Sequence, residues 1–236
     1  MTDKTEAIGT RVAAVLTVWL IVLLAWGEAH GDTPVSLYES FAGNIAFTGT
    51  VGTLRTESNY DDYCANTTGP TQGDLSGLPG SATIEKAYLY WAGSGNPDYT
   101  VTFEGNTVTA ERQYAASWDS RDFFSGVVDV TSTVAAKGNG TYTLADLAIE
   151  DDGDYCSRAT VLGGWTLLVV YSDASEDFRV LNLYEGFETY QYDSITVNPS
   201  NFEISGSFTS GQAGHITWEG DPDLAGGSED LTFNGH

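Results

Sequence analysis

The sequence predicts an all-β protein, a β-sandwich of jelly-roll type built from about a dozen short strands. After an apolar N-terminal run, β-branched and aromatic stretches alternate with breaks rich in Gly, Asn, Asp and Ser. No segment keeps helical periodicity beyond about two turns. The clearest piece is residues 163–186, in which two apolar runs, 165–171 and 178–184, flank the polar turn 172–177. This pattern is typical of two paired strands in a buried sheet.

The N-terminus predicts an export signal over residues 1–29, followed by a single β domain over residues 30–236. Residues 12–26 are almost wholly apolar, but they are shorter than the roughly 20 residues that a membrane-spanning helix needs. Lys4 and Arg11 supply the positive charges that precede such a signal. An uncleaved anchor is the alternative. On either reading we expect the remainder to lie outside the membrane.

Each strand is predicted from a short run of β-forming residues between turn formers. In chain order the candidate strands are residues 35–41, 46–54, 82–91, 99–103, 107–113, 123–130, 141–149, 165–171, 178–184, 194–197, 202–208, 215–218 and 231–233.

Three segments give more detail. A hairpin is expected over residues 99–110, with Gly105 and Asn106 taking the positive φ values of a tight turn. Strand 165–171 is apolar on both faces, which predicts a central position in its sheet. Residues 58–80 are the longest predicted irregular loop.

Charge excludes some partners. The chain has 33 acidic and 9 basic residues, a formal net charge of -24, which disfavours nucleic acid and anionic membrane surfaces. Such acidity is typical of a protein in salty or divalent-rich water, where cations screen self-repulsion. Simple solubility at a cell surface would account for it equally well.

The only two cysteines, Cys64 and Cys156, follow similar residues, Asp-Asp-Tyr and Gly-Asp-Tyr. In an exported chain a pair of this kind predicts one disulfide. The acidic neighbours argue against a catalytic thiol, because they would raise the pKa of the sulfur.

Several fragments together resemble a family of exported bacterial cell-surface proteins of unassigned function, in which an N-terminal β domain precedes repeat or adhesin-like modules. The fragments are residues 82–93, 124–131, 138–142, 155–156, 161–186, 218–221 and 231–235. The resemblance implies a secreted, adhesin-like surface module with no catalytic residues to carry over. It also implies that the domain continues beyond Gly235, so that this chain is a truncated piece or receives its missing strands from another chain.

The sequence offers few residues of the kinds that catalytic sites use. His215 is the only histidine placed inside the predicted fold, and no Gly-x-Ser-x-Gly motif is present. Acidic residues are abundant, so a carboxylate-dependent glycoside hydrolase remains an alternative. Its two carboxyl groups cannot be paired from linear sequence.

Two acidic turns are candidate calcium sites, because hard cations prefer several carboxylate and carbonyl oxygens on a flexible loop. The predicted ligands are Asp151, Asp152 and Asp154 in the first turn and Glu219, Asp221 and Asp223 in the second. An ordinary solvated acidic turn is the alternative for each.

Four tryptophans, Trp91, Trp118, Trp165 and Trp218, suggest either core packing or platforms for sugar rings. Trp91 and Trp165 lie in strongly apolar strands and are predicted to be buried. Trp118 lies in a polar context and is the candidate glycan-binding residue.

The sequence therefore favours a secreted or cell-surface structural or adhesive module that binds proteins or glycans, assisted by calcium. Its partners would be other chains bound by strand addition, surface glycans, or a second copy in a homo-oligomer. A carbohydrate-binding module and a carboxylate-dependent hydrolase are the alternatives.

Overall fold

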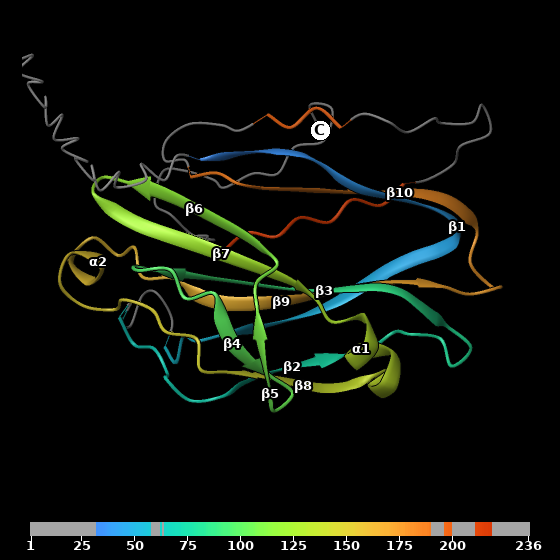
Figure 1. Cartoon of the computed structure of the whole chain (residues 1–236), viewed down its shortest axis with the longest axis horizontal. Coiled ribbons are helices and arrows are strands. Elements are labelled where there is room, and N and C mark those ends of the chain that lie inside the picture. The colour runs from blue at the N-terminus through green and yellow to red at the C-terminus, as the bar shows by residue number, and fades with distance from the viewer. Residues whose placement is uncertain (1–31, 58–61, 63, 190–195, 200–210, 219–236) are drawn as a thin grey trace, which may run out of the picture.

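The computed structural model describes residues 32–57, 62, 64–189, 196–199 and 211–218. Within them the chain forms two antiparallel sheets, which confirms the all-β prediction (Figure 1). One sheet has the order β10-β1-β9-β3-β7-β6 and the other the order β2-β8-β4-β5. The elements are β1 (Thr33–Thr53), β2 (Thr71–Leu75), β3 (Thr83–Ser94), β4 (Thr100–Phe103), β5 (Asn106–Thr109), β6 (Arg112–Trp118), β7 (Arg121–Asp129), α1 (Thr131–Lys137), β8 (Gly140–Ala145), α2 (Gly153–Ser157), β9 (Gly163–Ser172) and β10 (Phe178–Phe187).

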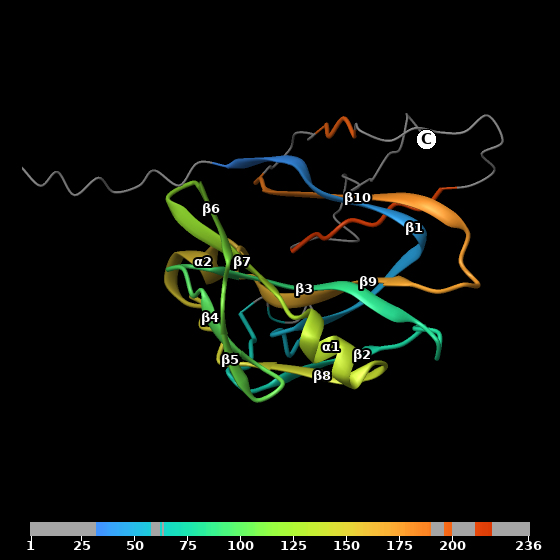
Figure 2. The same ribbon diagram turned by 45° about the vertical axis from the view of Figure 1, so that its right-hand side comes forward.

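Strand β1 is one 21-residue strand that folds over, where the sequence predicted two strands. Residues 33–44 pair with β10, whereas residues 45–53 pair with β9. The predicted break between the two strands coincides with this bend, at Gly43, whose φ of 155° is a conformation that L side chains rarely adopt. Figures 1 and 2 show the consequence: residues 33–44 and β10 form a two-stranded layer above the central strands. We call this layer the ribbon.

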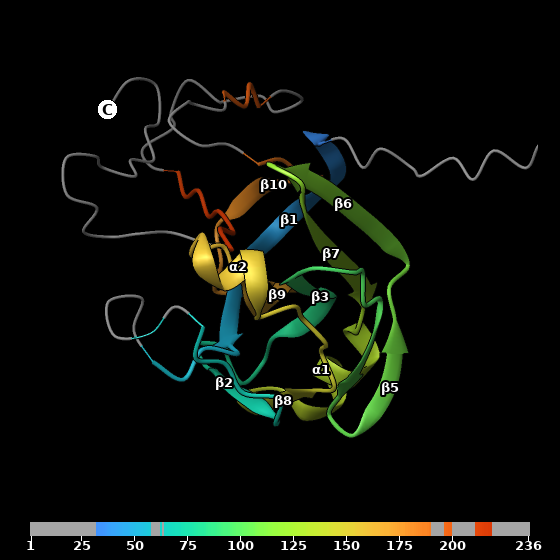
Figure 3. The same cartoon turned by 90° about the vertical axis from the view of Figure 1, so that its left-hand side faces the viewer.

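The molecule thus has three layers. Figure 3, seen from the end that carries α2, shows the ribbon above β9 and β3, with β2 and β8 below them. We use "central sheet" for β9, β3, β7, β6 and residues 45–53 of β1. The four-stranded sheet covers its lower face and the ribbon covers its upper face.

The predicted direct pairing of residues 165–171 with residues 178–184 is wrong. Strand β1 lies between β9 and β10 and pairs with both. Residues 173–177 do not close a tight hairpin, because they carry the chain from the central sheet to the ribbon alongside the bend of β1. The predicted central position of β9 is confirmed, since it pairs with β1 on one side and β3 on the other.

The main apolar core lies between the central sheet and the four-stranded sheet. Trp91 and Trp165 are buried in it, as predicted, and the Trp165 Nε1–H donates to Thr71 Oγ1 at 2.8 Å. Gly52 makes room for this indole: a Cβ at position 52 would lie 2.2 Å from Trp165 Nε1. Trp165 therefore ties the central sheet to β2 of the four-stranded sheet.

The hairpin between β4 and β5 forms as predicted, but its turn lies one residue earlier. Glu104 and Gly105 have φ values of 52° and 76°, and Asn106 already pairs with Phe103. This is the two-residue loop in which both central residues need positive φ. Between Thr109 and Arg112 the predicted strand 107–113 is interrupted, giving β5 and β6.

The predicted loop over residues 58–80 contains strand β2, which pairs with β8. Residues 215–218, predicted as a strand with His215 in it, form no strand, and His215 is exposed. The predicted strands 202–208 and 231–233 lie outside the described residues. In the described part of the chain, no helix has both the length and the apolar character that crossing a membrane requires.

Candidate functional site

The predicted disulfide is present, joining Cys64 to Cys156 with an S–S distance of 2.02 Å. It ties the segment between β1 and β2 to α2, across 92 residues of sequence. Both cysteines pack against a second buried cluster that contains Phe123 and Tyr155. The disulfide therefore fixes one end of the molecule, the end that carries α2.

Trp118 lies at this same end, as the last residue of β6 before the turn to β7. The turn uses positive φ at Asp119 and Ser120, and the Arg121 guanidinium carbon lies 4.6 Å from the Trp118 ring centroid. The indole is half-buried, not freely exposed. Trp118 is thus a partly covered platform, with a buried arginine against its ring.

The first acidic turn holds Asp151, Asp152 and Asp154 in exposed positions. Asp152 precedes α2, yet its side chain makes no capping hydrogen bond. Among the described residues no group of three or more acidic, His or Cys side chains is arranged to hold a metal ion. Glu219, Asp221 and Asp223 of the second turn lie outside the described residues.

A buried ion pair that the sequence did not reveal joins the ribbon to the central sheet. Glu185 of β10 is 4% exposed and accepts from Arg112 of β6 through both oxygens, at 2.7 Å and 2.9 Å. The same carboxylate accepts from the hydroxyls of Tyr90, at 2.6 Å, and Tyr114, at 2.9 Å. Every oxygen of Glu185 is therefore matched by two donors, which is the condition under which a buried charge is tolerated.

A second set of polar contacts extends this network along the ribbon. Glu39 of β1 accepts from the Tyr88 hydroxyl at 2.5 Å. The Arg112 guanidinium carbon lies 4.1 Å from the ring centroid of Tyr38 and 4.8 Å from that of Tyr88. We call these six residues, Glu185, Arg112, Tyr90, Tyr114, Glu39 and Tyr88, the interlayer network. It holds the ribbon by directional contacts.

The electrostatics agree with this geometry. Burial and the hydrogen bond to Glu185 raise the pKa of Tyr114 to about 12, and burial beside the same carboxylate raises the pKa of Tyr90 further. Burial opposes ionisation of Arg112, yet the bonds to Glu185 raise its pKa above the ordinary value. At neutral pH both tyrosines are donors and Arg112 is charged.

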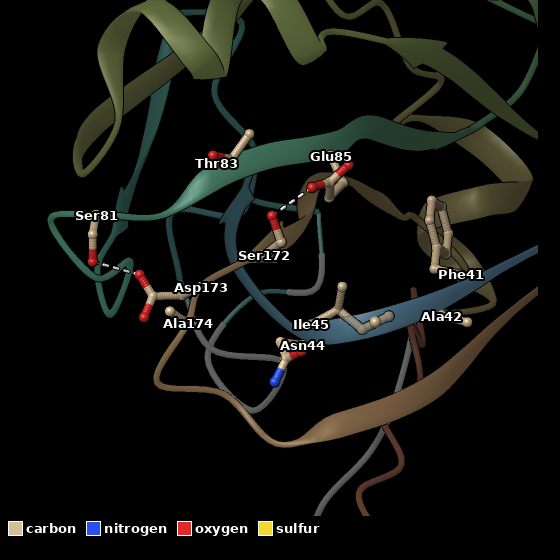
Figure 4. A pocket seen from close by; sticks show the side chains of 11 residues that line it. Phe41, Ala42, Asn44, Ile45, Ser81, Thr83, Glu85, Ser172, Asp173 and Ala174 are labelled. Atoms are coloured by element: carbon tan, nitrogen blue, oxygen red, sulfur yellow. Dashed lines mark hydrogen bonds between the residues drawn. The ribbon is translucent and has the colours of Figure 1, made fainter.

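The ribbon also encloses a groove where β1 bends (Figure 4). Its volume is about 510 Å³, and it opens to solvent between β1, the beginning of β3 and the end of β9. The lining residues are Phe41, Ala42, Gly43, Asn44, Ile45, Ser81, Thr83, Glu85, Ser172, Asp173 and Ala174. The Ser81 hydroxyl donates to Asp173 at 2.5 Å, and the Ser172 hydroxyl donates to Glu85.

Two carboxyl groups in a groove raise the question of hydrolysis. Hydrogen bonds from Ser175 and Ser81 lower the pKa of Asp173 below its ordinary value. A general acid of a glycoside hydrolase needs the opposite shift. Asp173 therefore lies in the groove as a carboxylate that accepts hydrogen bonds from neighbouring serines.

The outer edge of β10 is the other conspicuous feature of the ribbon. Strand β10 ends its sheet, and among the described residues no strand pairs with that edge. Phe178 is 72% exposed and Val180 is 45% exposed. An edge strand with exposed apolar side chains favours pairing with a further strand.

Comparison with known proteins gives one match. Residues 30–235 match the model of a family described as a protein of unknown function, DUF3344. No curated protein and no solved structure matches the chain.

Proposed function

Since the chain belongs to the DUF3344 family of unknown function, its role rests on its own residues, and we propose that it is a secreted or cell-surface structural and adhesive module that binds another polypeptide by strand addition. The single observation that carries this proposal is the beginning of β10, residues 178–181, where no described strand pairs with the outer edge and where Phe178 and Val180 are exposed. The partner to which we commit is a second copy of this chain.

In the part of the chain that the structure describes, the beginning of β10 carries few of the usual protections against pairing. The strand runs for ten residues without a proline, and it carries exposed apolar residues at its beginning. Natural edge strands are commonly blunted by lysines, prolines or shortness. Here Arg179 is the only basic residue in the strand, and its guanidinium is engaged by Glu176 and by the Ile45 carbonyl.

A second copy fits this edge by symmetry. Two β10 strands related by a two-fold axis would pair antiparallel and convert two ribbons into one four-stranded sheet. Phe178 and Val180 of each copy would then be covered. Such an interface uses the same surface twice, so that no second partner surface is required.

The proposed location is supported by chemistry of the chain. Disulfides such as Cys64–Cys156 persist in oxidising compartments outside the cytosol. The net charge of -24 suits a surface bathed in cations, and calcium assistance remains part of the proposal.

Light scattering after size exclusion tests the assembly, with the oxidised protein measured over a range of concentrations in calcium and in chelator. We expect a dimer that dissociates on dilution. The variant Phe178→Lys/Val180→Lys should be a monomer at every concentration, because paired copies would bury like charges.

Val51→Lys is the matched control, since Val51 is 67% exposed and lies outside the ribbon. It should leave the dimer intact. A wild-type monomer at all concentrations, or a dimer that survives the double lysine variant, would refute pairing through β10. A dimer found only in calcium would assign the metal to assembly.

A further inference from the structure

We propose that the groove at the bend of β1 binds a neutral sugar, one or two rings of a glycan, independently of any pairing through β10. The groove is distant in sequence from Trp118, the residue that first suggested glycan binding. Its volume of about 510 Å³ lies within the usual range for small-molecule sites, roughly 300 to 1,000 Å³. The ligand class follows from the groups that line it.

The charge of the lining excludes anionic ligands. Its ionisable residues are Glu85 and Asp173, and no Lys, Arg or His is among the lining residues. The remaining polar groups are the amide of Asn44 and the hydroxyls of Ser81, Thr83 and Ser172. The Asn44 amide nitrogen donates to the Glu176 carbonyl at 2.6 Å, and the Ser81 and Ser172 hydroxyls donate to the two carboxylates. Their oxygens can still accept hydrogen bonds, so the groove offers mainly acceptors to the hydroxyls of a neutral sugar, which donate.

Glu85 is aimed into the groove by an irregularity of β3. The register between β3 and β9 shifts between Ile84 and Lys86, so Glu85 is an extra residue at a bulge. One oxygen of its carboxylate accepts from Ser172. Within the described structure the other oxygen takes no hydrogen bond, which leaves it available to a ligand hydroxyl.

Asp173 is fixed as an acceptor before any ligand binds. Its Oδ2 accepts from Ser81 and its Oδ1 accepts from the backbone N–H of Ser175 at 2.9 Å. These bonds hold the carboxylate in one orientation at the end of the groove (Figure 4). A rigid acceptor loses less conformational entropy on binding than a free one.

Phe41 supplies the apolar wall. It lies at the other end of the groove from Asp173 (Figure 4), on the ribbon strand. The face of an aromatic ring carries partial negative charge and attracts the C–H groups on one face of a sugar ring. A sugar resting on Phe41 would direct its hydroxyls toward Glu85 and Asn44.

A metal ion is a weaker occupant of the same groove. A calcium site needs six to eight oxygen ligands, usually with several carboxylates. In the described part of the chain, no three acidic, His or Cys side chains converge here. Both carboxylates of the groove already accept hydrogen bonds from serine hydroxyls.

The test is a glycan array carrying neutral and acidic oligosaccharides, followed by calorimetric titration of the glycan that gives the strongest signal. We expect binding to neutral glycans. Phe41→Ala and Glu85→Gln should each weaken the affinity about tenfold or more, the loss expected for one well-placed contact. Unchanged thermal melting of each variant would show that the fold survives.

Two variants outside the groove serve as controls. Phe178→Ala removes an exposed aromatic side chain from the same ribbon, outside the groove, and should bind as wild type. Trp118→Ala should also bind as wild type. Absence of binding on the array, or loss of binding in Trp118→Ala alone, would overturn the proposal, as would calorimetric binding of calcium alone that Glu85→Gln abolishes.

Discussion

The two faces of the central sheet are covered by different chemistry. Its lower face packs against the four-stranded sheet through a cluster of buried apolar side chains, which includes Trp91, Trp165 and Leu89. Its upper face meets the ribbon through the interlayer network, in which Glu185 and Arg112 form a buried ion pair. Among the described residues, two smaller apolar clusters supplement that network, one around Tyr88, Tyr90 and Val127 and one that contains Phe187 of β10.

The difference shows that one sheet can be covered by two layers held in different ways, one by apolar packing and the other by directional polar contacts. Apolar contacts are non-directional and scale with the area removed from water. A buried ion pair roughly balances its own desolvation, so it contributes position more than stability, and it fails when one partner is lost. We therefore expect the lower layer to set the stability of the fold and the network to set the placement of the ribbon.

The largest expected effect comes from the lower face. Trp165→Ala removes a side chain that is 1% exposed and leaves the Thr71 hydroxyl without its partner. The free energy of unfolding should fall by about 4 kcal/mol. Urea denaturation measures it, with Trp118→Ala as the control because Trp118 is only half-buried. If the two variants lost equal stability, the lower core would not dominate.

The next largest effect comes from the upper face, where we expect the free energy of unfolding to fall by about 3 kcal/mol. Glu185→Gln leaves the Arg112 guanidinium, whose side chain is 16% exposed, without a counter-ion. We expect hydrogen exchange to accelerate in β10 and in residues 33–44, while β3 and β9 stay protected. The ribbon would then open separately from the lower layers.

The double variant Glu185→Leu/Arg112→Met supplies the control for this prediction. It removes both charges together and should recover part of the lost stability, because no buried charge is left unpaired while the Tyr90 and Tyr114 hydroxyls still lose their acceptor. Uniform acceleration of exchange across both sheets in Glu185→Gln would show that the two faces unfold as one unit.

The same division explains what the sequence could predict. The burial of Trp91 and Trp165 in the lower core could be predicted, because their strands are apolar over most of their length. The disulfide follows from two cysteines alone. By contrast, the pairing of β9 and β10 with one bent strand is a long-range choice, and the local turn pattern of residues 172–177 pointed to the wrong partner.

The contacts of the upper face could not be predicted from the sequence, because they too depend on long-range pairing. The alternation along β10 places Glu185 on the inward side, which is a visible signal, but its partner Arg112 lies 73 residues away. The groove depends on the bend at Gly43 and the bulge at Glu85. Neither is encoded by a motif, so the site could be found only once the layers were assembled.

The smallest expected effect concerns an ion pair beside the interlayer network, where Lys86 Nζ lies 2.8 Å from Asp129 Oδ2 and 5.9 Å from the ring centroid of Tyr88. Burial opposes ionisation of Asp129, but hydrogen bonds from Lys86 and Thr131 lower its pKa below the ordinary value of 3.8. A depressed pKa stabilises the fold above the unfolded value and loses that contribution as the pH falls through the folded value. The contribution should be under about 1 kcal/mol, because the pair is partly exposed and screened.

Thermal melting between neutral pH and about pH 3 checks this contribution. Asp129→Asn should lower the melting temperature slightly at neutral pH and should flatten the decline below about pH 4, where wild type protonates the group. Asp177→Asn is the matched control, since that carboxylate is 92% exposed and lies 3.6 Å from Arg179. A steeper acid decline in Asp129→Asn than in wild type would reverse the sign and mean that burial, not pairing, governs the carboxyl. The upper face would then be held by the Glu185 pair without electrostatic help from its neighbour.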